Sequence, residues 1–282
     1  MPKSDTAQWA AALEGFTKES FEADGKRREV YRAGQGPAVV IISEMPGITP
    51  LVAEFGRKVV AAGCTAVMPH IFGDPGRPVS AVYALESFGP ACVSREFSAF
   101  ALKKTSPITV WLRQLAAAEH ERCGGPGVGV IGMCFTGGFA LAMMVDDIVL
   151  APVLSQPSLP FPLNKRYKAD IGISDTDLDR VKERTASGTC LLGLRFSNDP
   201  FCFEERFATL RRELGDAFIA VEIDSSPGNP HGHPKNAHSV LTEHLVDREG
   251  TPTRAALDQT LAFFREKLGV GTGPGPGSGA HE

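Results

Sequence analysis

The sequence Gly127-Val128-Gly129-Val130-Ile131-Gly132-Met133-Cys134-Phe135-Thr136-Gly137-Gly138 sets the architecture of this chain. An apolar run ends in Gly-x-Cys, and small residues then lead into the apolar segment 139–144. This pattern predicts a strand, a sharp turn and a helix, with the thiol of Cys134 at the apex. A side chain on so tight a turn needs neighbours without bulk, which explains the flanking glycines. The N–H groups at the helix start favour a thiolate there.

With serine at the apex, this strand–turn–helix unit is the nucleophile elbow of α/β-hydrolases. We therefore predict that Cys134 is a nucleophile; the plain alternative is a buried thiol in a glycine-rich turn. The spacing Gly127-x-Gly129-x-x-Gly132 also occurs in dinucleotide-binding loops, but here the glycines belong to the strand itself, so no nucleotide cofactor is expected. The six cysteines form no C-x-x-C pair and no zinc-type cluster with histidine, so no metal is expected.

The net charge of −4 is small, and both signs are spread along the chain. Without a basic block or stripe, no nucleic-acid partner is expected. Residues 1–5 lack the apolar core of a signal peptide, and no apolar run is long enough to span a bilayer. We therefore expect a cytoplasmic protein without a membrane partner, either a monomer or a homodimer.

Strand and helix patterns alternate along the chain. This alternation predicts an α/β fold with a mostly parallel, doubly wound sheet and helices on both faces. Residues 1–268 are expected to form one α/β-hydrolase domain, with the irregular segment 72–104 as a lid or pocket wall, and the Gly/Pro-rich tail 269–282 is expected to be disordered. Asp24-Gly25 predicts a hairpin, and the other expected elements are strands over 37–44, 65–71, 128–132, 148–153, 189–196 and 218–223 and helices over 51–62, 107–121, 176–183, 203–214 and 254–268.

Candidates for the acid and the base follow Cys134, in the order that α/β-hydrolases use. Asp199 comes directly after a predicted strand, although an aspartate before proline also forms turns. His238 lies where a loop enters an apolar segment, and we prefer it as the base. His231 and His233, flanked by proline and glycine, have the character of surface loop residues but stay open as alternatives.

From about residue 30 to 268 the chain resembles the dienelactone hydrolase family. Three segments carry the resemblance: Ser43-Glu44-Met45-Pro46-Gly47 after the first central strand, Gly132-Met133-Cys134 at the elbow, and Ala237-His238-Ser239. The resemblance implies a triad of Cys134, His238 and Asp199. It also implies hydrolysis of a small ester or lactone through an acyl-thioester.

The resemblance gives Glu44 the role of accepting the thiol proton. A carboxylate at the end of a buried strand needs a partner, and we expect the thiol of Cys134 or an arginine of segment 72–104. The alternative is a carboxylate that serves the N-terminus of the next helix. The backbone N–H groups of Met45 and Phe135 are expected to form the oxyanion hole.

The sequence departs from the family at two positions. Thr136 stands where glycine is usual, and is expected either to crowd the turn or to place a hydroxyl at the site. Thr242 stands where the enzymes that open dienelactones carry a carboxylate-binding arginine. Arg95 is the nearest candidate for a second such arginine, although a plain surface role for Arg95 is the preferred alternative. The resemblance therefore implies another ester or lactone as substrate. The alternative is a non-catalytic relative that binds a small acid or senses redox state through Cys134.

Overall fold

The computed structural model describes residues 3–80, 82–83, 86, 106–159 and 165–271. Within these ranges the strands form one sheet in the order β1-β2-β4-β3-β5-β6-β7-β8. β1 and β4 pair antiparallel with β2, and all other neighbouring strands are parallel. The predicted α/β fold is thereby confirmed. The strands are β1 (Thr17–Ala23), β2 (Lys26–Ala33), β3 (Ala38–Ile42), β4 (Thr65–Pro69), β5 (Val128–Met133), β6 (Val149–Ser155), β7 (Leu191–Phe196) and β8 (Phe218–Ile223).

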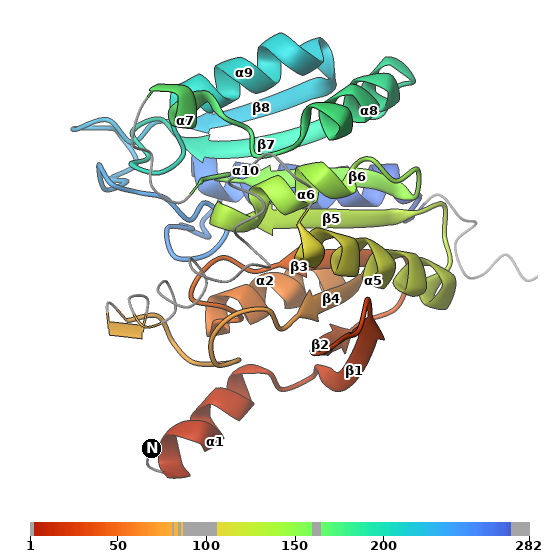
Figure 1. Ribbon diagram of the computed structural model, residues 1–282. Coiled ribbons are helices and arrows are strands. Elements are labelled where there is room, and N and C mark those ends of the chain that lie inside the picture. The colour runs from red at the N-terminus through yellow and green to blue at the C-terminus, as the bar shows by residue number, and fades with distance from the viewer. Residues whose placement is uncertain (1–2, 81, 84–85, 87–105, 160–164, 272–282) are drawn as a thin grey trace, which may run out of the picture.

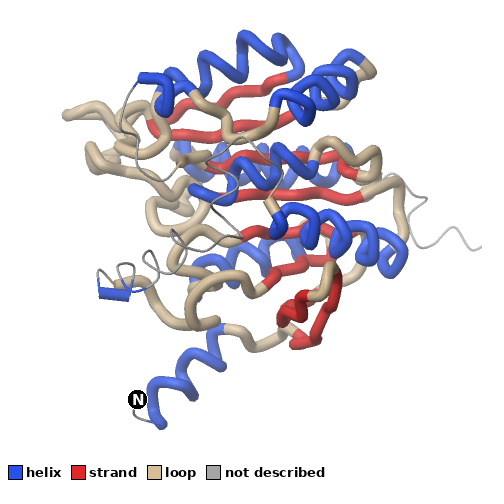
Figure 2. Tube along the Cα trace, in the orientation of Figure 1, coloured by secondary structure: helices blue, strands red, loops and turns tan. Residues whose placement is uncertain are grey.

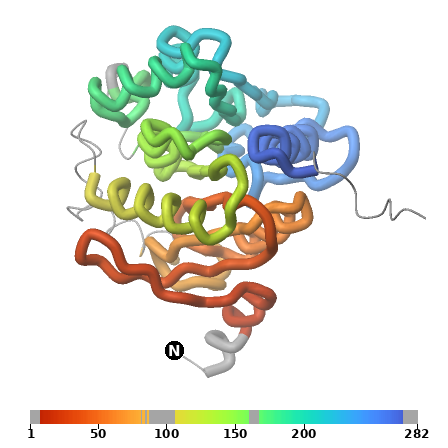
Figure 3. The backbone as a smooth tube through the Cα atoms, turned by 90° about the vertical axis from the view of Figure 1, so that its right-hand side faces the viewer, coloured from red at the N-terminus to blue at the C-terminus, as the bar shows by residue number. Residues whose placement is uncertain are grey.

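Helices cover both faces of the sheet, which Figure 3 shows edge-on. α5, α6, α8 and α9 pack on one face and α2 and α10 on the other, and a separate apolar core lies under each set. The helix bounds are α1 (Lys3–Ala12), α2 (Pro50–Ala61), α5 (Pro107–Cys123), α6 (Gly137–Met143), α7 (Lys165–Ala169), α8 (Asp175–Ala186), α9 (Glu204–Leu214) and α10 (Pro252–Lys267), with short 3-10 turns η1 (Cys134–Thr136) and η2 (Gly215–Ala217).

Local sequence signals account for several element ends. The hairpin between β1 and β2 turns at Asp24 and Gly25, whose φ angles of 48° and 67° suit a two-residue turn. α8 begins after Ser174, whose Oγ accepts a hydrogen bond from Asp177 N at 3.0 Å. The short helix α7 was not predicted.

β5 lies in the middle of the sheet, paired with β3 and β6. Every residue of this strand is buried, as expected for an apolar run covered on both faces. The arrowheads of the parallel strands point to one side of the molecule in Figure 1, and Figure 2 shows loops gathered there. Ligand sites in such sheets lie at this carboxyl edge. A functional site is therefore expected among the loops that follow β3, β5, β6, β7 and β8.

Some expectations fall outside the described residues. Most of segment 72–104, including Arg95, and nearly all of the tail 269–282 lie there. Among the described residues, no helix is long and apolar enough to cross a membrane.

Candidate functional site

Cys134 is held at the apex of a turn that tolerates little bulk. Its φ is 56°, in the left-handed region that residues with a side chain rarely adopt. A Cβ at Gly132 would lie 2.2 Å from Thr136 O, and one at Gly137 would lie 2.7 Å from Pro157 Cβ. Both glycines are therefore required by close approach of neighbouring atoms, and together they present the thiol above the end of β5.

Thr136 neither crowds the turn nor places its hydroxyl at the thiol. The side chain is fully buried, and its Oγ1 accepts a hydrogen bond from Met133 N at 2.8 Å. The hydroxyl lies within donating distance of two carbonyl oxygens, Ile42 O at 2.8 Å and Met133 O at 2.9 Å. Thr136 therefore fastens the elbow from below to the end of β3.

Asp199 and His238 form a couple at the neighbouring strand ends. His238 Nδ1 lies 2.9 and 2.8 Å from the two carboxylate oxygens of Asp199. Asp199 Oδ1 also accepts hydrogen bonds from Phe201 N at 2.8 Å and Cys202 N at 3.0 Å. These backbone donors fix the carboxylate, which in turn orients the imidazole.

The other imidazole nitrogen is directed toward the thiol. His238 Nε2 is buried and, among the described residues, makes no hydrogen bond of normal geometry. Burial alone would lower the pKa of His238, but negative charge at Cys134 and the hydrogen bond to Asp199 raise this pKa well above its ordinary value. The site thus favours the protonated form of His238.

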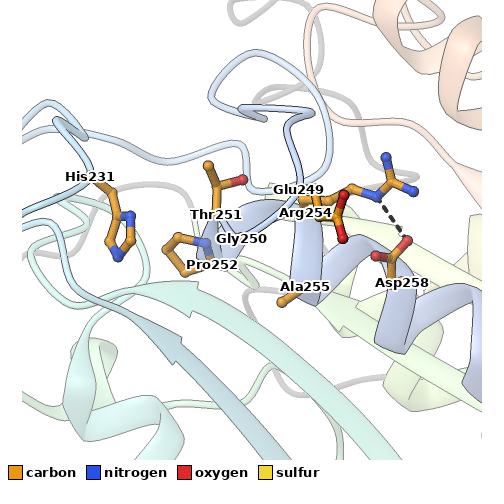
Figure 4. Close-up of a pocket in the computed structure, with 8 residues that line it drawn as sticks. All are labelled: His231, Glu249, Gly250, Thr251, Pro252, Arg254, Ala255 and Asp258. Atoms are coloured by element: carbon orange, nitrogen blue, oxygen red, sulfur yellow. Dashed lines mark hydrogen bonds and ion pairs between the residues drawn. The ribbon is translucent and has the colours of Figure 1, made fainter.

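The structure separates His238 from the two alternative histidines. His231 lines a cavity of about 460 Å³ together with Thr251, Pro252 and Arg254 at the start of α10, and these residues are drawn in Figure 4. His233 packs its ring against Phe196 at 5.2 Å between centroids, and burial, together with the charge of His231, lowers its pKa. Among the described residues, neither His231 nor His233 forms a hydrogen bond with Asp199.

Ser158 contacts the thiol and was missed by the sequence analysis. Its Oγ lies 3.1 Å from Cys134 Sγ, and its backbone N donates to Cys134 O at 3.0 Å. Ser158 comes shortly after β6, the strand that pairs with β5. Its place beyond a parallel strand end was the one available signal, because serine is common in loops and no motif marked it.

The carboxylate of Glu44 is held by a buried polar network. Ser239 Oγ donates to it at 2.6 Å, Gln156 Nε2 at 3.1 Å, and the Thr242 hydroxyl also donates. The amide oxygen of Gln156 in turn accepts from Val240 N at 3.2 Å. Among the described residues these partners are neither the thiol of Cys134 nor an arginine, and they join the loop after β3 to the segment that carries His238.

Two expected oxyanion donors occupy suitable elements. Met45 follows Glu44 in the loop after β3, and Phe135 is the second residue of η1. The described part of the chain holds no cluster of three or more His, Cys, Asp or Glu side chains that could bind a metal ion.

The sheet order, the strand–elbow–helix unit and the His–Asp couple at its carboxyl edge define an α/β-hydrolase. More narrowly, the chain belongs to the dienelactone hydrolase family, whose model matches residues 28–268. No curated protein matched the chain closely enough to count as a relative.

Solved structures share the fold at low sequence identity. A Klebsiella pneumoniae protein provisionally described as a dienelactone hydrolase is 15% identical, with a TM-score of 0.61 over 89% of this chain and 98% of the other. The dienelactone hydrolase-like promiscuous phosphotriesterase P91, from metagenomic libraries, is 17% identical, with a TM-score of 0.57 over 90% and 98%. Dienelactone hydrolase from Anabaena variabilis is 13% identical, with a TM-score of 0.57 over 90% and 100%.

Proposed function

We propose that this protein hydrolyses a small ester or lactone, with Cys134 as nucleophile, His238 as base and Asp199 as the group that orients it. The observation that carries the proposal is the couple of His238 with Asp199, 2.8 Å apart, whose remaining imidazole nitrogen faces a thiol at the apex of an elbow. A nucleophile, a base and an orienting carboxylate are the parts that acyl transfer requires.

The chemistry runs in two halves. Cys134 Sγ attacks the carbonyl carbon as thiolate, and the N–H groups of Met45 and Phe135 stabilise the oxyanion. As the intermediate collapses, the carbon–oxygen bond breaks and the His238 imidazolium protonates the leaving alkoxide. His238 then takes a proton from water, the hydroxide attacks the thioester, and Cys134 leaves as thiolate.

We assign Glu44 a positioning role in this reaction, because its carboxylate already accepts hydrogen bonds from Ser239, Thr242 and Gln156. The Ser158 hydroxyl lies 3.1 Å from Sγ, and in this mechanism we assign it to donate to the sulfur when Cys134 acts as thiolate. His238 rather than Glu44 then accepts the protons that the reaction moves.

Turnover of p-nitrophenyl acetate and of a lactone panel tests the proposal. Cys134→Ala should lose at least about 10³-fold in kcat/KM, because the triad acts as a unit. Asp258→Asn, on the exposed face of α10, is a control that should keep parental activity. A Cys134→Ala variant as active as the parent contradicts the mechanism, and a parent inactive on every ester and lactone contradicts the function.

A further inference from the structure

Arg206, at the start of α9, is a buried cation with an unusual set of partners. It is 2% exposed, yet it forms no ion pair with a carboxylate within the described residues. Its guanidinium donates to backbone carbonyl oxygens from three separate segments: Pro157 after β6, Phe201 after β7, and Tyr167 and Asp170 around α7. Burying a charge in this way is costly, so the arrangement calls for a compensating role.

The first of these contacts leads to the nucleophile. Arg206 Nη1 donates to Pro157 O at 2.7 Å, and the next residue is Ser158. Ser158 contacts Cys134 twice, through its hydroxyl at 3.1 Å from Sγ and its N–H at 3.0 Å from Cys134 O. Arg206 therefore fixes the loop that touches the thiol.

The second contact leads to the acid. Arg206 Nη1 also lies 3.4 Å from Phe201 O, and Phe201 N donates to Asp199 Oδ1 at 2.8 Å. The Phe201 ring packs edge-on against the His238 ring, with centroids 5.2 Å apart. One guanidinium thus joins the two loops that flank the His–Asp couple.

The charges around Arg206 are those of the site. Burial lowers its pKa, and negative charge on Asp170, Cys134 and Asp199 opposes that shift. Cys202 also lies nearby, but burial raises the pKa of its thiol, so this thiol stays neutral and supplies no charge. Cys134 interacts electrostatically with His238, Arg206 and Cys202, and those three groups are acted on in turn by Asp199, Asp170 and Arg195.

We propose that Arg206 is a positioning residue whose buried positive charge stabilises the Cys134 thiolate while its fork holds the Ser158 and Asp199 loops in register. The proposal rests on the proposed function in that it takes Cys134 as the reactive thiol. One imidazolium, that of His238, lies between two groups that carry negative charge in this proposal, Asp199 and Cys134, and Arg206 supplies the second positive charge.

The chain offers a matched control in Arg184 on α8. Arg184 is 5% exposed and likewise donates to backbone carbonyls, those of Met144, Asp146, Asp147 and Val149. These carbonyls precede or begin β6, at the opposite edge of the sheet from Cys134. The loss of Arg184 should therefore destabilise the fold without reaching the thiol.

The experiment measures Cys134 alkylation by iodoacetamide across pH, with peptide mapping, in Arg206→Met, Arg206→Lys and Arg184→Met. Arg206→Met should slow alkylation at pH 7 by about tenfold and move its midpoint to higher pH, since a nearby charge is lost. Arg206→Lys keeps the charge but loses the fork, so its midpoint should stay near the parent while its Tm falls. Arg184→Met should lower Tm and leave alkylation unchanged.

Parental alkylation of Cys134 in folded Arg206→Met, or an equal slowing in Arg184→Met, overturns the proposal. If Arg206→Met does not fold, Arg206→Lys carries the test: a midpoint shifted well above the parent also overturns it. Because alkylation requires no turnover, the two proposals fail separately. If Cys134 is alkylated rapidly in both the parent and Arg206→Met, only the role of Arg206 is wrong. If Arg206→Met slows alkylation but the parent protein hydrolyses no ester or lactone, only the hydrolase function is wrong.

Discussion

At the scale of single residues, Cys134, the proposed nucleophile, has an unfavourable backbone conformation. A φ of 56° costs a residue with a Cβ about 1–2 kcal/mol relative to the right-handed region, whereas glycine adopts it freely. A Cβ at Gly132 or at Gly137 would clash with neighbouring atoms, so the turn is closely packed on both sides of Cys134. The elbow therefore stores strain at the position where the thiol is needed.

The strain can be measured with two inactive variants. We expect Cys134→Gly to be about 1 kcal/mol more stable than Cys134→Ala, because glycine adopts the left-handed region without the Cβ clash. Chemical denaturation of both variants gives the difference directly. Equal stability, or a less stable glycine variant, would show that the turn is not strained at this residue.

The raised pKa of His238 makes the stability of the protein depend on pH. Burial opposes this rise, and Cys134 and Asp199 outweigh it, so the folded state has the higher pKa. The resulting stability is present below the unfolded pKa of about 6.5 and disappears as the pH rises through the folded value. The imidazolium thus contributes to stability on the acidic side.

Asp199→Asn tests this linkage. It should lose more unfolding free energy at pH 6 than at pH 9, because the imidazolium that Asp199 stabilises is present at the lower pH. Asp258→Asn is the control, since its partner Arg254 does not titrate in this interval. An equal loss at both pH values for Asp199→Asn would contradict the raised pKa.

At the scale of elements, the Glu44 network holds three loops together. It joins the loop after β3, the end of β6 at Gln156, and the segment of Ser239 and Thr242 next to His238. Gln156 is fully buried and adopts a φ of 38°, so the backbone accepts a rare conformation in order to place its amide. The network thereby fixes His238 relative to Met45.

Glu44→Gln and Glu44→Ala separate positioning from proton transfer. Glu44→Ala leaves buried donors without an acceptor and should cost about 2–3 kcal/mol of unfolding free energy. Glu44→Gln should lower kcat/KM for ester hydrolysis by about tenfold and leave Cys134 alkylation at pH 7 near the parental rate, because the loops shift while the thiolate persists. Alkylation that falls as far as hydrolysis would show instead that Glu44 takes the thiol proton.

The elements that the sequence predicts best are those fixed by local pattern. β5 and α6 follow from an apolar run and small residues, and the hairpin follows from Asp24-Gly25. The partners of Glu44 and the contact of Ser158 with Cys134 join residues far apart in the chain, so no local pattern marks them. Thr136 departs from the glycine that is usual at its position, but only the folded structure shows that its hydroxyl donates to the carbonyl of Ile42 at the end of β3.

At the scale of the whole molecule, a buried ion pair connects the N-terminal hairpin of β1 and β2 to helix α5, which covers one face of the sheet. Arg32 of β2 donates through Nε to Glu119 of α5 at 2.8 Å, and Glu119 is 2% exposed. Arg32 pairs in register with Val67, the central residue of β4, and Glu119 lies near the end of α5, which leads to the start of β5 and not to the carboxyl edge where Cys134 lies. This pair should affect stability and leave the chemistry alone.

Arg32→Met should cost about 3–5 kcal/mol, because it leaves the Glu119 carboxylate buried without a counter-charge. The double variant Arg32→Met with Glu119→Leu should recover most of that loss. Denaturation of the two variants and the parent measures both steps. A double variant no more stable than the single one would mean that packing rather than charge sets the cost.

The covalent intermediate tests the central claim, that Cys134 is the nucleophile of an ester hydrolase, most directly. The protein is mixed with p-nitrophenyl acetate, quenched in acid during the first turnover and mapped by mass spectrometry. We expect one acetyl group on Cys134, absent from Cys134→Ala and decaying as water completes the cycle. Turnover with no acyl group on Cys134, or with the acyl group on Ser158 instead, would contradict the account.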